Sequence, residues 1–142
     1  MSARRERERG SAIVEFAVLG TLVFGVLVQA VVLFGTLHRA TLATSAAARE
    51  YGRAVVLADS AAGASDRGAL VVEQAARNHG LAPGSLHATV DGRRARGELL
   101  RVRVATDVPL LRVPFVGSVW PSLSIRVEAA HAVQVDRYRS RP

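Results

Sequence analysis

The sequence predicts a membrane-anchored α+β protein. A long N-terminal transmembrane helix is expected to extend into a small head, in which one helix packs on a roughly three-stranded antiparallel sheet. Three observations favour this class: an apolar run near the N-terminus, an alanine-rich segment without proline after it, and later segments of alternating apolar and polar residues. The expected organisation is a basic leader (1–10), a transmembrane helix (11–37), a helix extension (38–58) and an extracytoplasmic head (59–142).

The composition narrows the range of functions. The chain has 142 residues with 19 basic and 12 acidic side chains, a net charge of +7, no lysine and no cysteine. Disulfides, thiolate catalysis, cysteine-type zinc sites and lysine Schiff bases are therefore excluded. Because the arginines are dispersed, dense only in RRAR (93–96), and aromatic residues are scarce, we expect no nucleic-acid partner.

The run from Phe16 to Leu37, FAVLGTLVFGVLVQAVVLFGTL, predicts the membrane span, with Gln29 as its only strongly polar residue. About 22 residues of helix measure roughly 33 Å, which matches a hydrocarbon core of about 30 Å. The apolar region of a cleaved secretory signal is shorter, about 7–15 residues, although small residues at 40–48 keep a secreted product as an alternative. Gln29 and the glycines at 20, 25 and 35 are expected either to help helices approach or to face lipid.

The flanks of the span predict its orientation. The leader MSARRERERG is short and carries four arginines, whereas about a hundred residues follow the span. By the positive-inside rule, the N-terminus is expected inside and the head outside the cytoplasmic membrane.

Glu15 stands at the start of the span, where a carboxylate needs an explanation. Near the interface it can reach the headgroups, and the first turn of a helix favours an anion. A second explanation uses the spacing, because cleavage after Gly10 would make Ser11 the new N-terminus and Glu15 the fifth residue. The new ammonium, about 6 Å away along the helix, could then offset the carboxylate of a neighbouring subunit.

A basic leader, Gly10, four residues, and then Glu15-Phe16 opening an apolar helix resembles a type IV prepilin signal. The resemblance implies that a membrane aspartyl peptidase cuts after Gly10 on the cytoplasmic side. It also implies that the product assembles through its N-terminal helix, with Glu15 and Phe16 at the contact.

The segment AAAREYGRA (46–54) is similar to the alanine-rich stretch of TadE-like proteins, the pseudopilins of the tight-adherence pilus machinery. Arg49, Glu50, Gly52 and Arg53 match, and Tyr51 is inserted between the glutamate and the glycine. The resemblance implies a non-enzymatic pilus-assembly subunit whose partners are the prepilin peptidase and other pilin-like or Tad subunits. An ordinary amphipathic helix is the alternative reading of this segment.

The head begins with an expected loop at Asp59–Asp66, in which Ser65 or Asp66 would cap a helix from Arg67 to His79. Gly80 is the expected stop. The apolar face of this helix is predicted to contain four residues: Leu70, Val71, Gln74 and Ala75.

Three strands follow. Apolar residues alternate in LHATV (86–90), at 100–104, and from Ile125 to Val135, and DGRRARG (91–97) connects the first two segments. His131 interrupts the apolar face of the last strand and is expected to be half-buried rather than a ligand. Without a metal-binding spacing or a catalytic motif, we expect no metal, no cofactor, no small-molecule substrate and no enzyme.

The loop Asp107–Ser122 contains three prolines and many apolar residues. It is expected either to fold back over the core or to form an interface with a partner or membrane, with Phe115 and Trp120 as its contacts. Two other interpretations of the protein's function remain beside the pseudopilin. One is an uncleaved single-pass anchor that presents a small binding domain, and the other is a membrane-tethered hydrolase.

Overall fold

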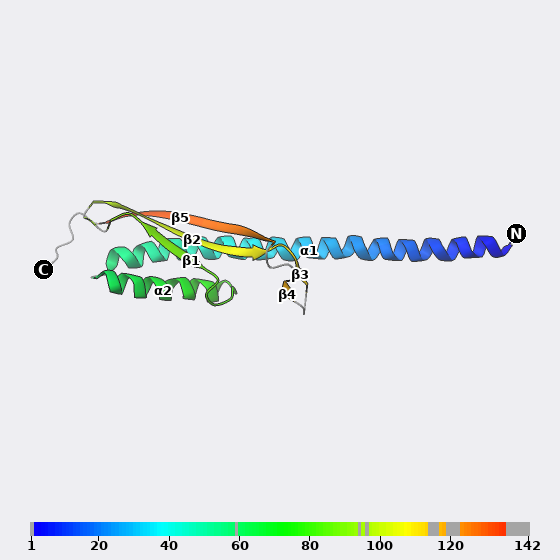
Figure 1. Ribbon diagram of the computed structural model, residues 1–142, viewed down its shortest axis with the longest axis horizontal. Helices are drawn as coiled ribbons and strands as arrows, with labels where there is room; N and C mark the ends of the chain where they lie inside the picture. The colour runs from blue at the N-terminus through cyan, green and yellow to red at the C-terminus, as the bar shows by residue number, and fades with distance from the viewer. Residues whose placement is uncertain are drawn as a thin grey trace.

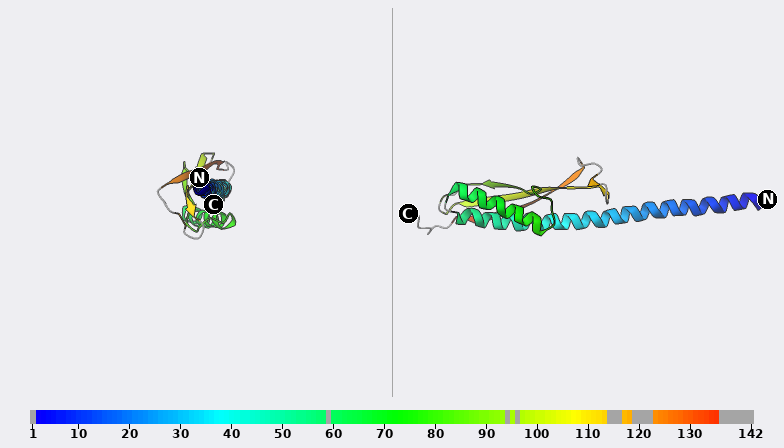
Figure 2. Two further views of the ribbon diagram at one scale, coloured as in Figure 1. Left: turned by 90° about the vertical axis from the view of Figure 1, so that its right-hand side faces the viewer. Right: turned by 90° about the horizontal axis from the view of Figure 1, so that it is seen from below.

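A computed structural model describes residues 2–58, 60–93, 95, 97–113, 117–118 and 123–135 of the chain. Its elements in order are α1 (Ser2–Leu57), α2 (Ala61–Asn78), β1 (His87–Asp91), β2 (Leu99–Pro109), β3 (Arg112–Val113), β4 (Gly117–Ser118) and β5 (Ser124–Gln134). The N-terminal half of α1 extends alone, while α2 and the strands gather around its C-terminal half (Figures 1 and 2). This arrangement confirms the predicted fold class.

α1 is one uninterrupted helix of 56 residues, about 84 Å long. From Ala12 to Val28 every residue is exposed, because no other described element reaches this part of the helix. Among the described helices, only α1 is long and apolar enough to span a membrane, and its most apolar stretch is fully exposed. Such a surface is consistent with a single-pass membrane anchor.

The C-terminal half of α1 carries a stripe of small buried side chains that faces the head. Ala40, Ala43, Thr44, Ala47 and Ala48 are at most 1 % exposed. Their spacing follows the helical repeat of three and four residues, so they form one continuous face. Small side chains on this face let the backbone of α1 approach both α2 and the sheet closely.

α2 begins six residues earlier than the sequence predicts, and the expected loop at Asp59–Asp66 is wrong. Ser60 is the N-cap, with extended backbone angles (φ −131°, ψ 163°), and its hydroxyl accepts a hydrogen bond of 3.0 Å from the Gly63 amide. Ser65 and Asp66 therefore lie inside the helix. The earlier start buries Ala64 against α1 residues at the end of the head, which a loop at this position would not do.

The buried face of α2 also differs from the prediction. Leu70 is 68 % exposed and Gln74 is exposed, while Ala64, Gly68, Ala75 and Ala76 are buried. A Cβ atom built on Gly68 would lie 2.5 Å from the ring of Tyr51, so any larger residue would require this ring to move. Close approach between the two helices thus selects small residues over large apolar ones.

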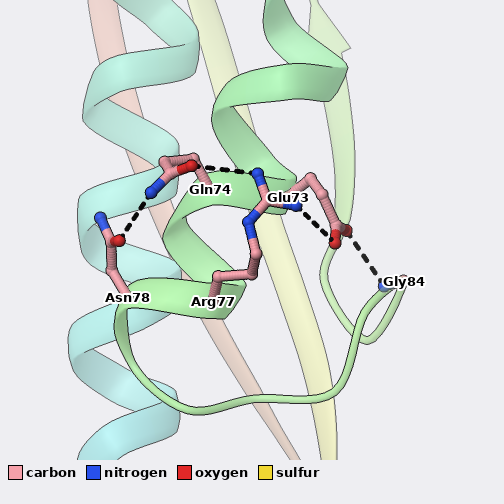
Figure 3. A network of polar contacts seen from close by, with 5 residues as sticks. All are labelled: Glu73, Gln74, Arg77, Asn78 and Gly84. Carbon is pink, nitrogen blue, oxygen red and sulfur yellow. Dashed lines mark hydrogen bonds and ion pairs between the residues drawn. The ribbon is translucent and has the colours of Figure 1, made fainter.

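The end of α2 agrees with the prediction. Gly80 has φ +66°, the Leu81 amide donates to the Ala76 carbonyl at 2.9 Å, and the Gly80 amide donates to the Arg77 carbonyl at 3.1 Å. This pattern is a Schellman motif. Glu73 then ties the helix to the following loop, since it accepts hydrogen bonds from Arg77 at 3.1 Å and from the Gly84 amide at 3.3 Å (Figure 3).

The three main strands form an antiparallel sheet in the order β1-β2-β5. β2 is central, and its residues Val102 and Val104 pair with His131 and Ala129 of β5. Side chains alternate as predicted, because Leu100, Val102 and Val104 are buried against the helices while the arginines at 101 and 103 are exposed. The outer face carries an ion pair of 2.9 Å between Arg103 and Asp91.

β2 and β5 are each 11 residues long, and β2 continues through Asp107 to Pro109. The predicted loop is therefore shorter than expected and contains the short antiparallel pair β3–β4. Phe115 and Trp120, the expected interface residues of this loop, lie outside the described residues.

The position of the N-cap predicts a difference between two serines of the same segment. Ser60→Ala removes the only side-chain acceptor at the start of α2 within the described structure, so it should lower the free energy of unfolding by about 1 kcal/mol. Ser65→Ala is the matched control and should change it by less than about 0.5 kcal/mol, because Ser65 is exposed within the helix. Urea denaturation followed by circular dichroism in detergent micelles measures both. Equal losses for the two variants would contradict this cap assignment.

Candidate functional site

The residues singled out by the sequence lie in separate places along α1. Gly10 and Ser11 belong to its first turns, and Glu15 and Phe16 lie on the bare helix. The segment starting at Arg49 lies in the head, 34 residues beyond Glu15, which corresponds to about 51 Å of helix. The structure therefore does not bring the expected processing, assembly and family-like residues together into one site.

Glu15 and Phe16 project from a helix surface that no described part of the head covers. Glu15 is exposed and Phe16 is 79 % exposed, among apolar neighbours with similar exposure. A Cβ atom built on Gly20, Gly25 or Gly35 would meet nothing within 4 Å, so the surface is open at all three glycines. What this stretch offers chemically is an apolar helix face with a carboxylate near one end, suited to lipid or to other helices.

The family-like segment combines exposed charges with a buried contact. Arg49, Glu50 and Arg53 are exposed, whereas Gly52 is buried under the sheet. A Cβ atom on Gly52 would lie 3.2 Å from Cγ1 of Val133 and 3.4 Å from Cδ2 of His131. The glycine thus sets the distance between α1 and β5, and the half-buried His131 covers it.

Gln29 makes a contact that the sequence does not reveal. Its Nε2 atom donates a hydrogen bond of 3.0 Å to the carbonyl oxygen of Leu110, 81 residues away. Gln29 was expected either to help helices approach or to face lipid, and in the structure it is joined to the residue that follows β2. In the sequence, the one sign of this contact is a polar residue within an apolar run.

A pocket of about 340 Å³ lies between α2 and β1, above the ring of Tyr51. Ser65, Glu73 and His87 are among its lining residues. No hydrogen bond within the described structure joins Ser65 to His87, and Glu73 is engaged by Arg77 and the Gly84 amide. Across the described ranges, no three histidine, aspartate or glutamate side chains gather closely enough to hold a metal ion.

With the fold and these positions established, the chain can be compared with known proteins. No family model, no curated protein and no solved structure matches it.

The burial of Gly52 predicts that a side chain at this position separates the head from α1. Gly52→Leu should lower the free energy of unfolding by about 1–3 kcal/mol, because its Cβ alone already presses on Val133 and the remaining carbons overlap the sheet. Arg53→Leu, the exposed neighbour, is the matched control and should stay within about 0.5 kcal/mol of the parent. Urea denaturation in micelles gives both values. A Gly52→Leu variant as stable as Arg53→Leu would disprove the close contact.

Proposed function

We propose that the protein is a TadE-like pilus-assembly subunit, a minor pseudopilin that is processed after Gly10 and assembled through its N-terminal helix. The observation that carries the proposal is the bare stretch of α1, with Glu15 at its start and no described head residue over it. A helix face kept free in this way is available to the helices of neighbouring subunits. The continuous connection to the segment 46–54, which resembles the TadE-like stretch, gives further support.

In this proposal, the leader lies in the cytoplasm and α1 crosses the cytoplasmic membrane, with the head outside. A prepilin peptidase removes residues 1–10 and leaves the ammonium of Ser11 about 6 Å along the helix from Glu15. A carboxylate in an apolar environment is costly, and an ion pair with the ammonium of an adjacent subunit would lower that cost. Phe16 supplies apolar contact area beside the pair.

A second candidate is an uncleaved single-pass anchor whose head binds a ligand. The pocket between α2 and β1 favours it, because Tyr51, Glu73 and His87 place aromatic and polar groups around one volume. The two candidates differ in their first step, since only the pseudopilin requires cleavage.

Cleavage is tested by intact mass. The protein expressed with a prepilin peptidase should lose the mass of residues 1–10, and the protein expressed without the peptidase should retain it. Gly10→Val should block the loss because a β-branched side chain replaces the glycine at the scissile bond. Gly20→Val, in the open part of the helix, should be cut normally. A leader that remains attached in every case would favour the uncleaved anchor.

The role of Glu15 is tested separately. Glu15→Ala should be cleaved normally but should enter assembled complexes at least about tenfold less, the change that corresponds to about 1.4 kcal/mol of lost pairing. Val14→Ala shortens an exposed neighbour without removing charge and should assemble like the parent. Cross-linking in membranes that contain the partner subunits measures the assembled fraction. Efficient assembly of Glu15→Ala would refute the pairing role.

A further inference from the structure

The end of the head nearest the N-terminus lies beside the apolar span rather than beyond it. The Gln29 side chain donates to the Leu110 carbonyl at 3.0 Å, and the Leu110 amide donates to the Leu123 carbonyl at 2.9 Å. β3 contacts α1 and pairs with β4 at the same end of the head (Figure 1). Leu110 and Leu123, the described residues next to the ends of β2 and β5, are therefore at the level of Gln29 along the helix.

The length of the span places this level inside the bilayer. Only 13 residues separate Phe16 from Gln29, which correspond to about 20 Å of helix. A hydrocarbon core of about 30 Å that starts at Phe16 ends near Thr36, followed by the polar His38 and Arg39. If the loop stayed in water, the bilayer would have to thin by about a third, and the apolar residues from Gln29 to Leu37 would leave the lipid.

From this geometry we propose that the described residues at this end of the head, around Leu110 and Leu123, are embedded in the leaflet on the head's side, with lipid acyl chains as their partner. Their surface suits that partner. Leu123 is 55 % exposed, and Val31 and Phe34 of α1 are exposed at the same end of the head. The sequence between Leu110 and Leu123 contains one charged residue, Arg112. These exposed apolar side chains extend the exposed apolar surface of α1 to this end of the head.

Backbone groups in lipid need partners within the protein, because no water is present to replace them. Both polar atoms of the Leu110 backbone are hydrogen-bonded, the amide to Leu123 and the carbonyl to Gln29. The described parts of β3 and β4 are paired with each other. The same contact gives one donor of the Gln29 amide a partner, so a single bond pairs a polar side chain with a polar carbonyl in this region.

Apart from Arg112, the charged residues next to this end of the head lie on the water side of the expected boundary. Arg39 and Asp107 line a pocket of about 170 Å³ that also contains Thr36, where the hydrocarbon is expected to end. Arg126 and Glu128 follow further along β5, with side chains on the outer face.

This inference rests on the membrane anchor of the proposed function, and site-directed labelling tests the two separately. The chain has no cysteine, so single-cysteine variants of the full-length protein carry one polarity-sensitive fluorophore each. A label at Phe24→Cys reports on the span, and a label at Leu123→Cys reports on the proposed embedded end of the head. A label at Leu99→Cys reports on the water side, because Leu99 is 60 % exposed at the other end of β2. Ile125→Cys provides a second loop position if Leu123→Cys alters the circular dichroism spectrum. The proteins are reconstituted singly in lipid nanodiscs, with either doxyl-labelled lipid or aqueous iodide as quencher.

We expect lipid quenching of the Leu123 label at least about twofold above that of the Leu99 label, because its position is up to about 10 Å inside the hydrocarbon. Iodide should quench the two labels in the opposite order. The proposal is overturned if iodide quenches the Leu123 label as strongly as the Leu99 label, or if neither quencher reaches the Leu123 label. In that case, lipid quenching of the Phe24 label would still support the membrane anchor. A Phe24 label that iodide quenches would instead refute the anchor itself.

Discussion

The close contact between the small-residue stripe of α1 and the inner face of the sheet supports the rest of the structure. Three strands and one short helix enclose too little apolar volume to be stable alone, and a large part of the core surface here belongs to α1. Ala43 and Ala47 complete one cluster with Val102 and Val104, while Val55 joins the second. Anchor and head are therefore one folding unit rather than a domain on a tether. A change in the tilt of the helix must move the head with it.

Because the helix and the head form one folding unit, charged and apolar side chains lie on different surfaces of the molecule. The exposed arginines and acids of the head lie on the outer face of the sheet and on the solvent side of the helices, while the surfaces next to α1 contain alanine, glycine and valine. The bare half of α1 shows the reverse pattern, with apolar side chains outside. The two patterns overlap along α1 between Gln29, which meets Leu110, and Thr36. The Gln29–Leu110 hydrogen bond marks the first described contact of the head with the helix, within the stretch suited to lipid.

The large elements could be predicted because their signals are local and periodic. The length of the apolar run predicts the span, and the alternation at 100–104 and 125–135 predicts the buried faces of β2 and β5. The start of α2 was not predictable, because Ser60 and Ser65 are both good caps and only packing of Ala64 favours the first. Its buried face was predicted only in part: Ala75 is buried as expected, but Leu70 is exposed, and the close contact of Gly68 with the Tyr51 ring has no signature in a pattern of large apolar residues. The Gln29 contact spans 81 residues and has no local signature. Gly52 was singled out by resemblance, and only the structure gives the steric reason for a glycine.

β5 has a consequence for how the protein is made. This strand is the last described element of the chain, yet its Val133 closes over Gly52 near the end of the first helix. Contacts between such distant segments form late, because the intervening chain must be ordered first. In a chain that is inserted from its N-terminus, the span is in place before β5 emerges from the ribosome. Until then the alanine stripe of α1 lacks its β5 cover, so the head reaches its final form only after β5 has been synthesised.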